Sequence, residues 1–110
     1  MAHNAQIGLF LVTLKEAISN GNFVVIQREK NNEFLALTGM TPQERENVIL
    51  ALRTTDYTSG PEEDRGNPGE KDIWKFKKKY LGRDIYIKFK LIPVEDGFYA
   101  KCLSFHKTDI

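Results

Sequence analysis

The stretch Asp84-Ile85-Tyr86-Ile87-Lys88-Phe89-Lys90-Leu91 decides the expected fold. Its odd positions are all apolar, whereas its even positions hold an aspartate, a tyrosine and two lysines. Because side chains alternate across a β-strand, the segment predicts a strand with one buried face and one cationic face that carries the tyrosine. An exposed sheet face of this kind suits a phosphate-bearing partner.

Two further strands are expected beside this one. The pattern predicts strands over about residues 73–80, 84–92 and 98–106, joined by turns at Gly82-Arg83 and at residues 95–97. With Gly82-Arg83 as a two-residue loop, apolar residues pair on one face and cations on the other. The predicted pairs are Trp74 with Leu91, Phe76 with Phe89, Lys75 with Lys90, Lys77 with Lys88, and Lys79 with Tyr86. Because facing like charges are destabilising, these rows of lysines suggest that an anion normally lies over them.

The strand at 98–106 adds to the cationic face. Leu103 and Phe105 belong to the predicted core, so Ser104 and His106 are expected on the opposite side of the sheet. Cys102 shares their parity, although a small half-buried apolar role fits a lone cysteine better. The predicted cationic face therefore comprises Lys75, Lys77, Tyr86, Lys88, Lys90, Ser104 and His106.

The first half of the chain predicts helices. Residues 9–19 show the spacing of a short amphipathic helix, and residues 23–27 that of a short strand. Residues 31–37 are ambiguous, with one or two helical turns as the interpretation. The clearest helix starts at Thr41-Pro42-Gln43-Glu44, where threonine and glutamate form a capping box, and it ends near residue 53 or 54.

Residues 58–71 predict an irregular loop, because they contain Gly60-Pro61, Asn67-Pro68 and several acidic residues. A loop of this length in a small domain is either functional or disordered, and the sequence leaves both open. Taken together, the segments predict one α+β domain over residues 1–110, with a small, mostly antiparallel sheet and helices packed on one face.

The composition is that of an ordinary globular domain of 110 residues, with 41% hydrophobic and 28% charged residues. The single cysteine excludes an intramolecular disulfide and a cysteine-based zinc site. No apolar run approaches the roughly 20 residues of a membrane helix, and the first residues lack the features of a signal peptide. We therefore expect a cytoplasmic protein with no membrane partner.

Charge is segregated along the chain. Residues 1–70 hold six Lys or Arg and ten Asp or Glu, whereas residues 71–110 hold ten and five. The basic half predicts an anionic partner. A lysine-rich sheet edge that prevents aggregation is the alternative, and charge alone does not choose between them.

The predicted cationic face carries the groups that metal-free RNA cleavage needs. The 2′-hydroxyl of RNA attacks the adjacent phosphate, so an enzyme has to move two protons and stabilise phosphoryl charge. A histidine, with an ordinary pKa near ~6.5, suits proton transfer at neutral pH, and lysines suit the charge. The alternatives are that His106 is a plain surface residue and that Tyr86 packs against a lysine stem. The sequence contains no pattern for a metal site or a cofactor.

Several short motifs resemble the motility quorum-sensing regulator (MqsR) toxins. They are Asn47-Val48-Ile49-Leu50-Ala51-Leu52, Asp56-Tyr57, Ser59-Gly60-Pro61-Glu62-Glu63-Asp64, Ile73-Trp74, Ile85-Tyr86-Ile87-Lys88 and Leu103-Ser104-Phe105-His106-Lys107. The resemblance implies a RelE-like α+β fold and an mRNA endoribonuclease of a type II toxin–antitoxin pair. It also implies a cognate antitoxin protein that often binds DNA, and it leaves dependence on ribosomes open.

The resemblance also implies roles for single positions. The catalytic tyrosine of the family falls on Tyr86, and His106 stands where the family has a catalytic lysine. Lys75 stands where the family has a glutamine, and Ser59 lies near a loop position where the family has a lysine.

The combined hypothesis gives catalysis to Tyr86, His106, Lys75 and Lys88, and RNA binding to Lys77, Lys90, Ser104, Ser59 and Arg65. For Arg65, pairing with its neighbour Asp64 is the alternative. The competing functions are a non-catalytic RNA-binding module and a basic face that docks an acidic protein.

Overall fold

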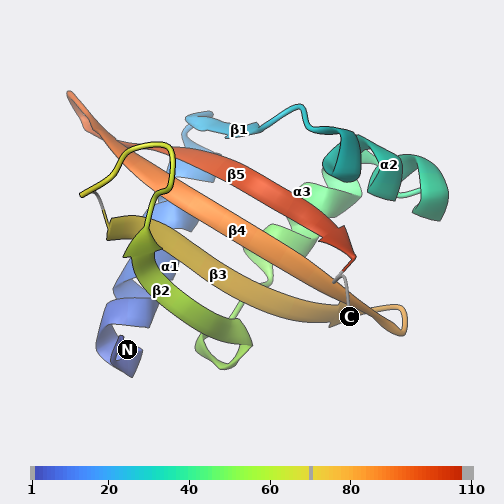
Figure 1. Ribbon diagram of the computed structural model, residues 1–110, viewed down its shortest axis with the longest axis horizontal. Helices are drawn as coiled ribbons and strands as arrows, with labels where there is room; N and C mark the ends of the chain where they lie inside the picture. Colours follow the sequence, from blue (N-terminus) through green and yellow to red (C-terminus); the bar gives the residue numbers. More distant parts are fainter. Residues whose placement is uncertain (1, 70, 108–110) are drawn as a thin grey trace.

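The computed structural model describes residues 2–69 and 71–107. Within these residues the chain forms a five-stranded sheet of order β1-β5-β4-β3-β2, in which only the β1–β5 pair is parallel (Figure 1). The elements are α1 (Asn4–Ser19), β1 (Phe23–Val25), α2 (Glu29–Thr38), α3 (Pro42–Leu50), η1 (Thr54–Asp56), β2 (Tyr57–Glu63), β3 (Lys71–Tyr80), β4 (Arg83–Val94) and β5 (Gly97–Lys107). The α+β class with a mostly antiparallel sheet is thereby confirmed.

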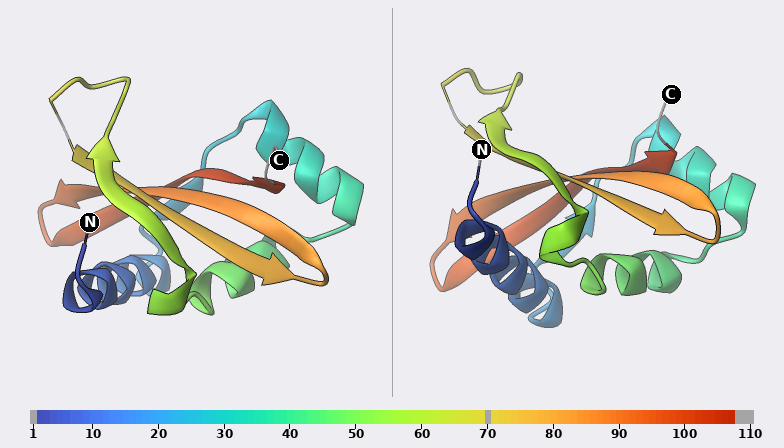
Figure 2. Two further views of the ribbon diagram at one scale, coloured as in Figure 1. Left: turned by 60° about the horizontal axis from the view of Figure 1, so that its bottom comes forward. Right: turned by 90° about the horizontal axis from the view of Figure 1, so that it is seen from below.

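Helices α1 and α3 lie across one face of the sheet, whereas α2 lies beside the β5 edge (Figure 2). The prediction that the helices share one face is therefore wrong for α2. The physical reason is the brevity of β1, which pairs only with residues 100–102 and leaves the rest of the β5 edge for α2. From that edge, Phe34 packs edge-on against Phe105 with ring centroids 5.8 Å apart. The opposite face of the sheet, called here the open face, is left uncovered by α1 and α3 (Figure 2).

The helix boundaries follow from packing and capping. Helix α1 starts five residues earlier than its apolar pattern predicts, and its Phe10 stacks on Trp74 of β3 with ring centroids 4.5 Å apart. The capping box of α3 is confirmed, because Thr41 Oγ1 accepts from the Glu44 N–H and Glu44 Oε1 accepts from the Thr41 N–H, both at 3.1 Å. The ambiguous segment is helical and ends at Gly39 in the left-handed region. No helix within the described residues has the length and apolarity to span a membrane.

The register of β3 against β4 corrects the predicted hairpin. Tyr80 pairs with Arg83, so the two-residue loop is Leu81-Gly82, and every predicted pair is wrong by two positions. Both loop residues have positive φ, 50° and 77°, as the tight turns that match strand twist require. A shift of two residues keeps each side chain on its predicted face. Lys75 therefore faces Lys88, but Lys77 faces Tyr86 and Lys79 faces Asp84, so the predicted stack of lysine rows is wrong.

A bulge in β5 corrects the placement of Cys102. Lys88 pairs with Ser104 and Phe89 pairs with Cys102, which leaves Leu103 as an extra residue between them. Beyond a bulge the parity of a strand reverses. Cys102 is therefore fully buried in the core, Leu103 is not part of it, and Ser104 keeps its predicted face.

The predicted loop at 58–71 is wrong in its first part, because Tyr57–Glu63 forms the edge strand β2 against β3. The irregular register of this pair hid the strand from periodicity analysis. At Gly60 the strands approach so closely that a Cβ atom would lie 2.6 Å from the Ile73 carbonyl oxygen. The loop proper is thus confined to the residues that follow Glu63.

Candidate functional site

Two neighbouring rows of side chains cross the open face from strand to strand. The first row runs Ser59, Lys75, Lys88 and Ser104, and the second runs Lys77, Tyr86 and His106. The structure therefore brings seven of the nine predicted site residues together. Sheet register alone does this, since directly paired residues project from the same face.

Tyr86 and His106 form the centre of the second row. They are direct cross-strand partners, and their rings lie 5.7 Å apart at 54°. Nδ1 of His106 lies 2.9 Å from the Lys107 carbonyl oxygen. Because a carbonyl only accepts hydrogen bonds, Nδ1 carries the proton in this contact, which leaves Nε2 of the neutral ring as an acceptor. The ring is thereby prepared to take up a proton.

Lys75 is held from two sides. Its ammonium lies 3.0 Å from Glu62 Oε2 on β2 and also interacts with the Tyr86 side chain. These contacts, the Glu62 hydrogen bond first, raise the pKa of Lys75 above its ordinary value. The Ser59 hydroxyl donates to the same carboxylate of Glu62. Lys75 is therefore a fixed positive charge beside the tyrosine.

Lys88 lies among other cations. Burial is the main cause that lowers its pKa, and repulsion from Lys75, Arg28 and Arg65 lowers it further. These neighbours come from β3, from the residue before α2 and from the loop after β2. Positive charge thus converges on Lys88 from three parts of the chain, and an anion bound there would relieve the repulsion.

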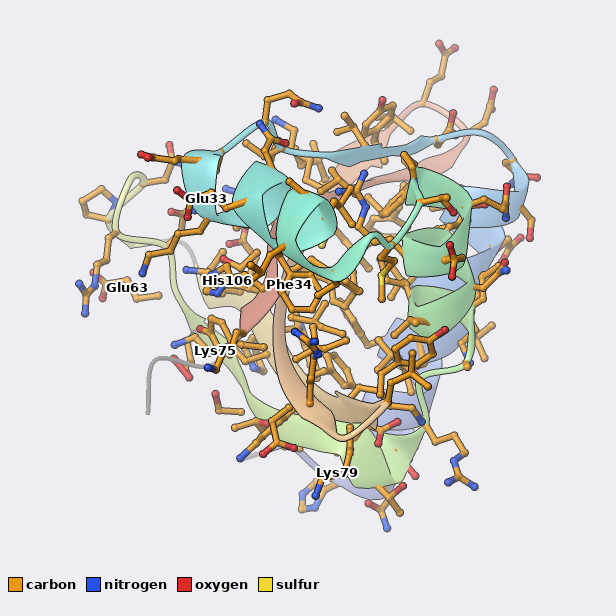
Figure 3. All side chains as sticks on the ribbon, turned by 90° about the vertical axis from the view of Figure 1, so that its right-hand side faces the viewer. Glu33, Phe34, Glu63, Lys75, Lys79 and His106 are labelled. Atoms are coloured by element: carbon orange, nitrogen blue, oxygen red, sulfur yellow. The ribbon has the colours of Figure 1, made fainter. Side chains whose placement is uncertain are left out.

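A groove of about 370 Å³ runs between the start of α2 and the open face. Its lining combines four predicted site residues with the start of α2: Tyr86, Lys88, Ser104 and His106, with Arg28, Glu29, Lys30 and Asn31. Sequence analysis missed Arg28 and Asn31. They follow the three-residue strand β1, which is too short for its pattern of side chains to predict where the next residues lie. Viewed toward α2, His106 and Phe34 lie just below the helix, with Lys75 farther from it (Figure 3).

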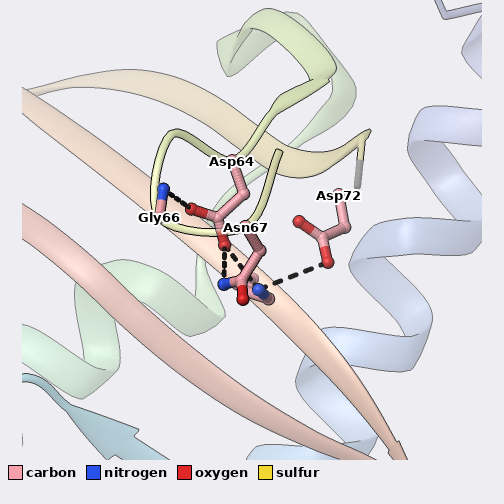
Figure 4. Close-up of polar contacts among 5 residues, drawn as sticks. Asp64, Gly66, Asn67 and Asp72 are labelled. Atoms are coloured by element: carbon pink, nitrogen blue, oxygen red, sulfur yellow. Dashed lines mark hydrogen bonds and ion pairs between the residues drawn. The ribbon is translucent and has the colours of Figure 1, made fainter. Parts of the chain in front are cut away.

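Lys90 lies farther along β4, where the loop after β2 folds against it. Lys90 pairs with Asp64 and lies 3.5 Å from Asp72 (Figure 4). Asp64 also accepts from the Gly66 N–H at 2.9 Å, and the Lys90 contact is the first cause that lowers its pKa to about 2. Lys90 thus forms ion pairs with acidic side chains of the protein itself. Asp64 pairs with Lys90 and not with its neighbour Arg65.

Lys77 lies at the more exposed end of the second row. Its ammonium lies 4.0 Å from Asp84, and the side chain is about half exposed. Among the described residues, no three His, Cys, Asp or Glu side chains gather in a way that could hold a metal ion.

Comparisons with known proteins give no family for the chain: no protein-family model, curated protein or solved structure matches it. The resemblance of its short motifs to the MqsR toxins thus stays a prediction. What the site does has to be argued from its own residues.

Proposed function

We propose that the protein is a metal-independent endoribonuclease that cuts RNA on the open face of its sheet. The observation that carries this proposal is the cross-strand pair of Tyr86 and His106, with rings 5.7 Å apart, at a groove that also contains Lys88. Two proton-transfer groups and a positively charged environment are what cleavage by the RNA 2′-hydroxyl requires.

The geometry suggests a division of roles. His106 Nε2 takes the proton of the 2′-hydroxyl as its oxygen bonds to phosphorus, and the Tyr86 hydroxyl gives its proton to the 5′-oxygen as the P–O5′ bond breaks. The products are a 2′,3′-cyclic phosphate and a 5′-hydroxyl. Lys75 stabilises the phenolate left on Tyr86 and, with Lys88, the charge on the phosphoryl oxygens.

The biological context of the proposal rests on the resemblance to the MqsR toxins. It assigns mRNA as the substrate, a neighbouring antitoxin protein as the inhibitor, a RelE-like arrangement of sheet and helices, and the cytoplasm as the place of action. The uncovered sheet face supports this assignment, because a long RNA strand can reach it without rearrangement of the helices.

A long end-labelled RNA incubated with the protein in EDTA tests the proposal. Wild type should yield discrete fragments, and His106→Ala should lose about 10²–10⁴-fold in rate, with Tyr86→Phe also strongly reduced. Tyr99→Phe and His3→Ala are matched controls that should cleave like wild type. RNA that stays intact with wild type, alone and with translating ribosomes, would contradict the proposal.

The second candidate is an RNA-binding module without catalysis. The convergence of Arg28, Arg65 and Lys75 on Lys88 favours it, because a positive groove binds RNA whether or not protons move. In that case affinity would fall steeply with salt, and no strand would be cut. Binding of an acidic protein in preference to RNA would instead indicate a protein-docking face.

A further inference from the structure

We infer that the groove between α2 and the open face is a phosphate-binding site, in which Arg28, Ser104 and the first backbone N–H groups of α2 hold the phosphodiester that is cut. The identity of the ligand as RNA rests on the function proposed above. The site itself rests on three separate observations, from the helix, from a buried hydroxyl and from the surrounding charge.

The start of α2 contains backbone N–H groups that the helix itself does not use. The helix runs over Glu29–Thr38, and its N-cap residue, Arg28, makes no side-chain cap hydrogen bond. The N–H of Asn32 bonds to the Arg28 carbonyl at 3.0 Å, so the N–H groups before it have no carbonyl partner within the helix. They sit at the positive end of the helix dipole, and Glu29 and Asn31, two of the residues that carry them, line the groove, an arrangement that favours anions.

The Ser104 hydroxyl gives independent support for a phosphate ligand in the groove. Ser104 is only 4% exposed and lines the groove. Within residues 2–69 and 71–107, no group hydrogen-bonds this hydroxyl. Asn31, buried next to it, instead uses its amide in three hydrogen bonds. A hydroxyl of a groove-lining residue that no described group uses is available as a donor to a ligand.

The charge around the groove selects an anion. Arg28 and Lys75 both repel Lys88, and Lys30 also lines the groove. Glu29 is the one acidic residue of the lining. A phosphate group provides several acceptor oxygens and a negative charge, so it satisfies the serine hydroxyl, the helix donors and the cations together.

Titration of the ¹⁵N-labelled protein with inorganic phosphate at constant ionic strength tests the site. Amide shifts should concentrate at Glu29, Lys30, Asn31 and Ser104. Arg28→Ala and Ser104→Ala should each weaken binding by about tenfold or more, because each removes a hydrogen bond to a charged ligand. Arg53→Ala and Ser19→Ala remove the same groups from exposed positions elsewhere and should bind like wild type.

RNA cleavage by the same variants separates this inference from the proposed function. Phosphate binding in the groove that is lost in Arg28→Ala and Ser104→Ala supports the site even if no RNA is cut, in which case the nuclease proposal alone fails. Shifts scattered over the surface, or variants that bind like wild type, overturn the site. Cleavage by wild type would then still support the nuclease.

Discussion

The Lys75 ammonium lies 3.0 Å from the Glu62 carboxylate, so an acid of β2 partly neutralises a cation of the candidate site. In Glu62→Gln this charge is removed while the side chain keeps its size. We expect RNA affinity at low salt to rise several-fold, because Lys75 no longer has to exchange a carboxylate for a phosphate. The dependence of log Kd on log salt should also steepen by about 0.7, the increment of one phosphate contact on a single strand.

Glu63→Gln is the matched control for this prediction. Glu63 is the next residue of the same strand and is exposed. Its replacement by glutamine changes the net charge by the same amount as Glu62→Gln. Equal gains in affinity from both variants would show that net charge, and not release of Lys75, is responsible.

Asn31 replaces a missing strand at the β5 edge. Its amide donates to the Ile26 and Leu103 carbonyls at 3.0 and 3.2 Å and accepts from the Phe105 N–H at 2.9 Å. Asn31→Ala should therefore lower the free energy of unfolding by about 2–4 kcal/mol, because buried backbone groups lose their partners. Urea unfolding measures this loss. Asn32→Ala, at an exposed position one residue later, should stay within about 0.5 kcal/mol of wild type, and an equal loss there would contradict the role of Asn31.

Gly60 lies where β2 approaches β3 closely. Its φ is 127°, and a Cβ atom would lie 2.6 Å from the Ile73 carbonyl oxygen. Gly60→Ala should cost about 1–3 kcal/mol of stability, or prevent folding of β2 altogether. Gly66→Ala is the control, because the nearest atom to its Cβ is a side-chain oxygen of Asp64 at 3.4 Å. Thermal melts that show equal losses for both variants would contradict the close approach as the cause.

The candidate site was largely predictable because strand parity is a local property. Tyr86, Lys88, Ser104 and His106 fall on one face, and a turn misplaced by one residue, which shifts the pairing by two, does not change this. The partners across the strands were not predictable in the same way. They depend on which residues adopt positive φ in the turn, and Leu81 has no sequence signal for doing so.

The residues missed by sequence analysis belong to segments in which apolar residues show no regular helical or strand spacing. Arg28 reaches the site because β1 is only three residues long and α2 follows it along the β5 edge. Glu62 reaches it because β2 is an irregular strand and not a loop. Both placements are decided by tertiary packing, which overrides local propensity.

Asp64 should make stability depend on pH in the acid range. Its pKa in the folded protein is about 2, below the ordinary 3.8, mainly because Lys90 hydrogen-bonds the carboxylate. A lowered pKa means that the ionised group stabilises the fold above its ordinary pKa, and that this contribution is lost as pH falls toward 2. The melting temperature of wild type should exceed that of Asp64→Asn at about pH 6, and the gap should close between about pH 4 and pH 2. A gap that stays constant over this range would contradict the contact.

The reactivity of Cys102 can test the bulge at Leu103, which decides on which face of β5 the cysteine lies. The thiol is fully buried, and burial raises its pKa to about 12, so almost no thiolate exists near pH 8. The folded protein should thus react with a disulfide reagent such as DTNB only as fast as it unfolds, and denaturant should restore the rate of a free thiol. If Leu103 did not bulge out of register, Cys102 would share the open face with Ser104. Rapid labelling of the folded protein would therefore contradict the bulge, and with it the register that places Ser104 and His106 beside Lys88 and Tyr86.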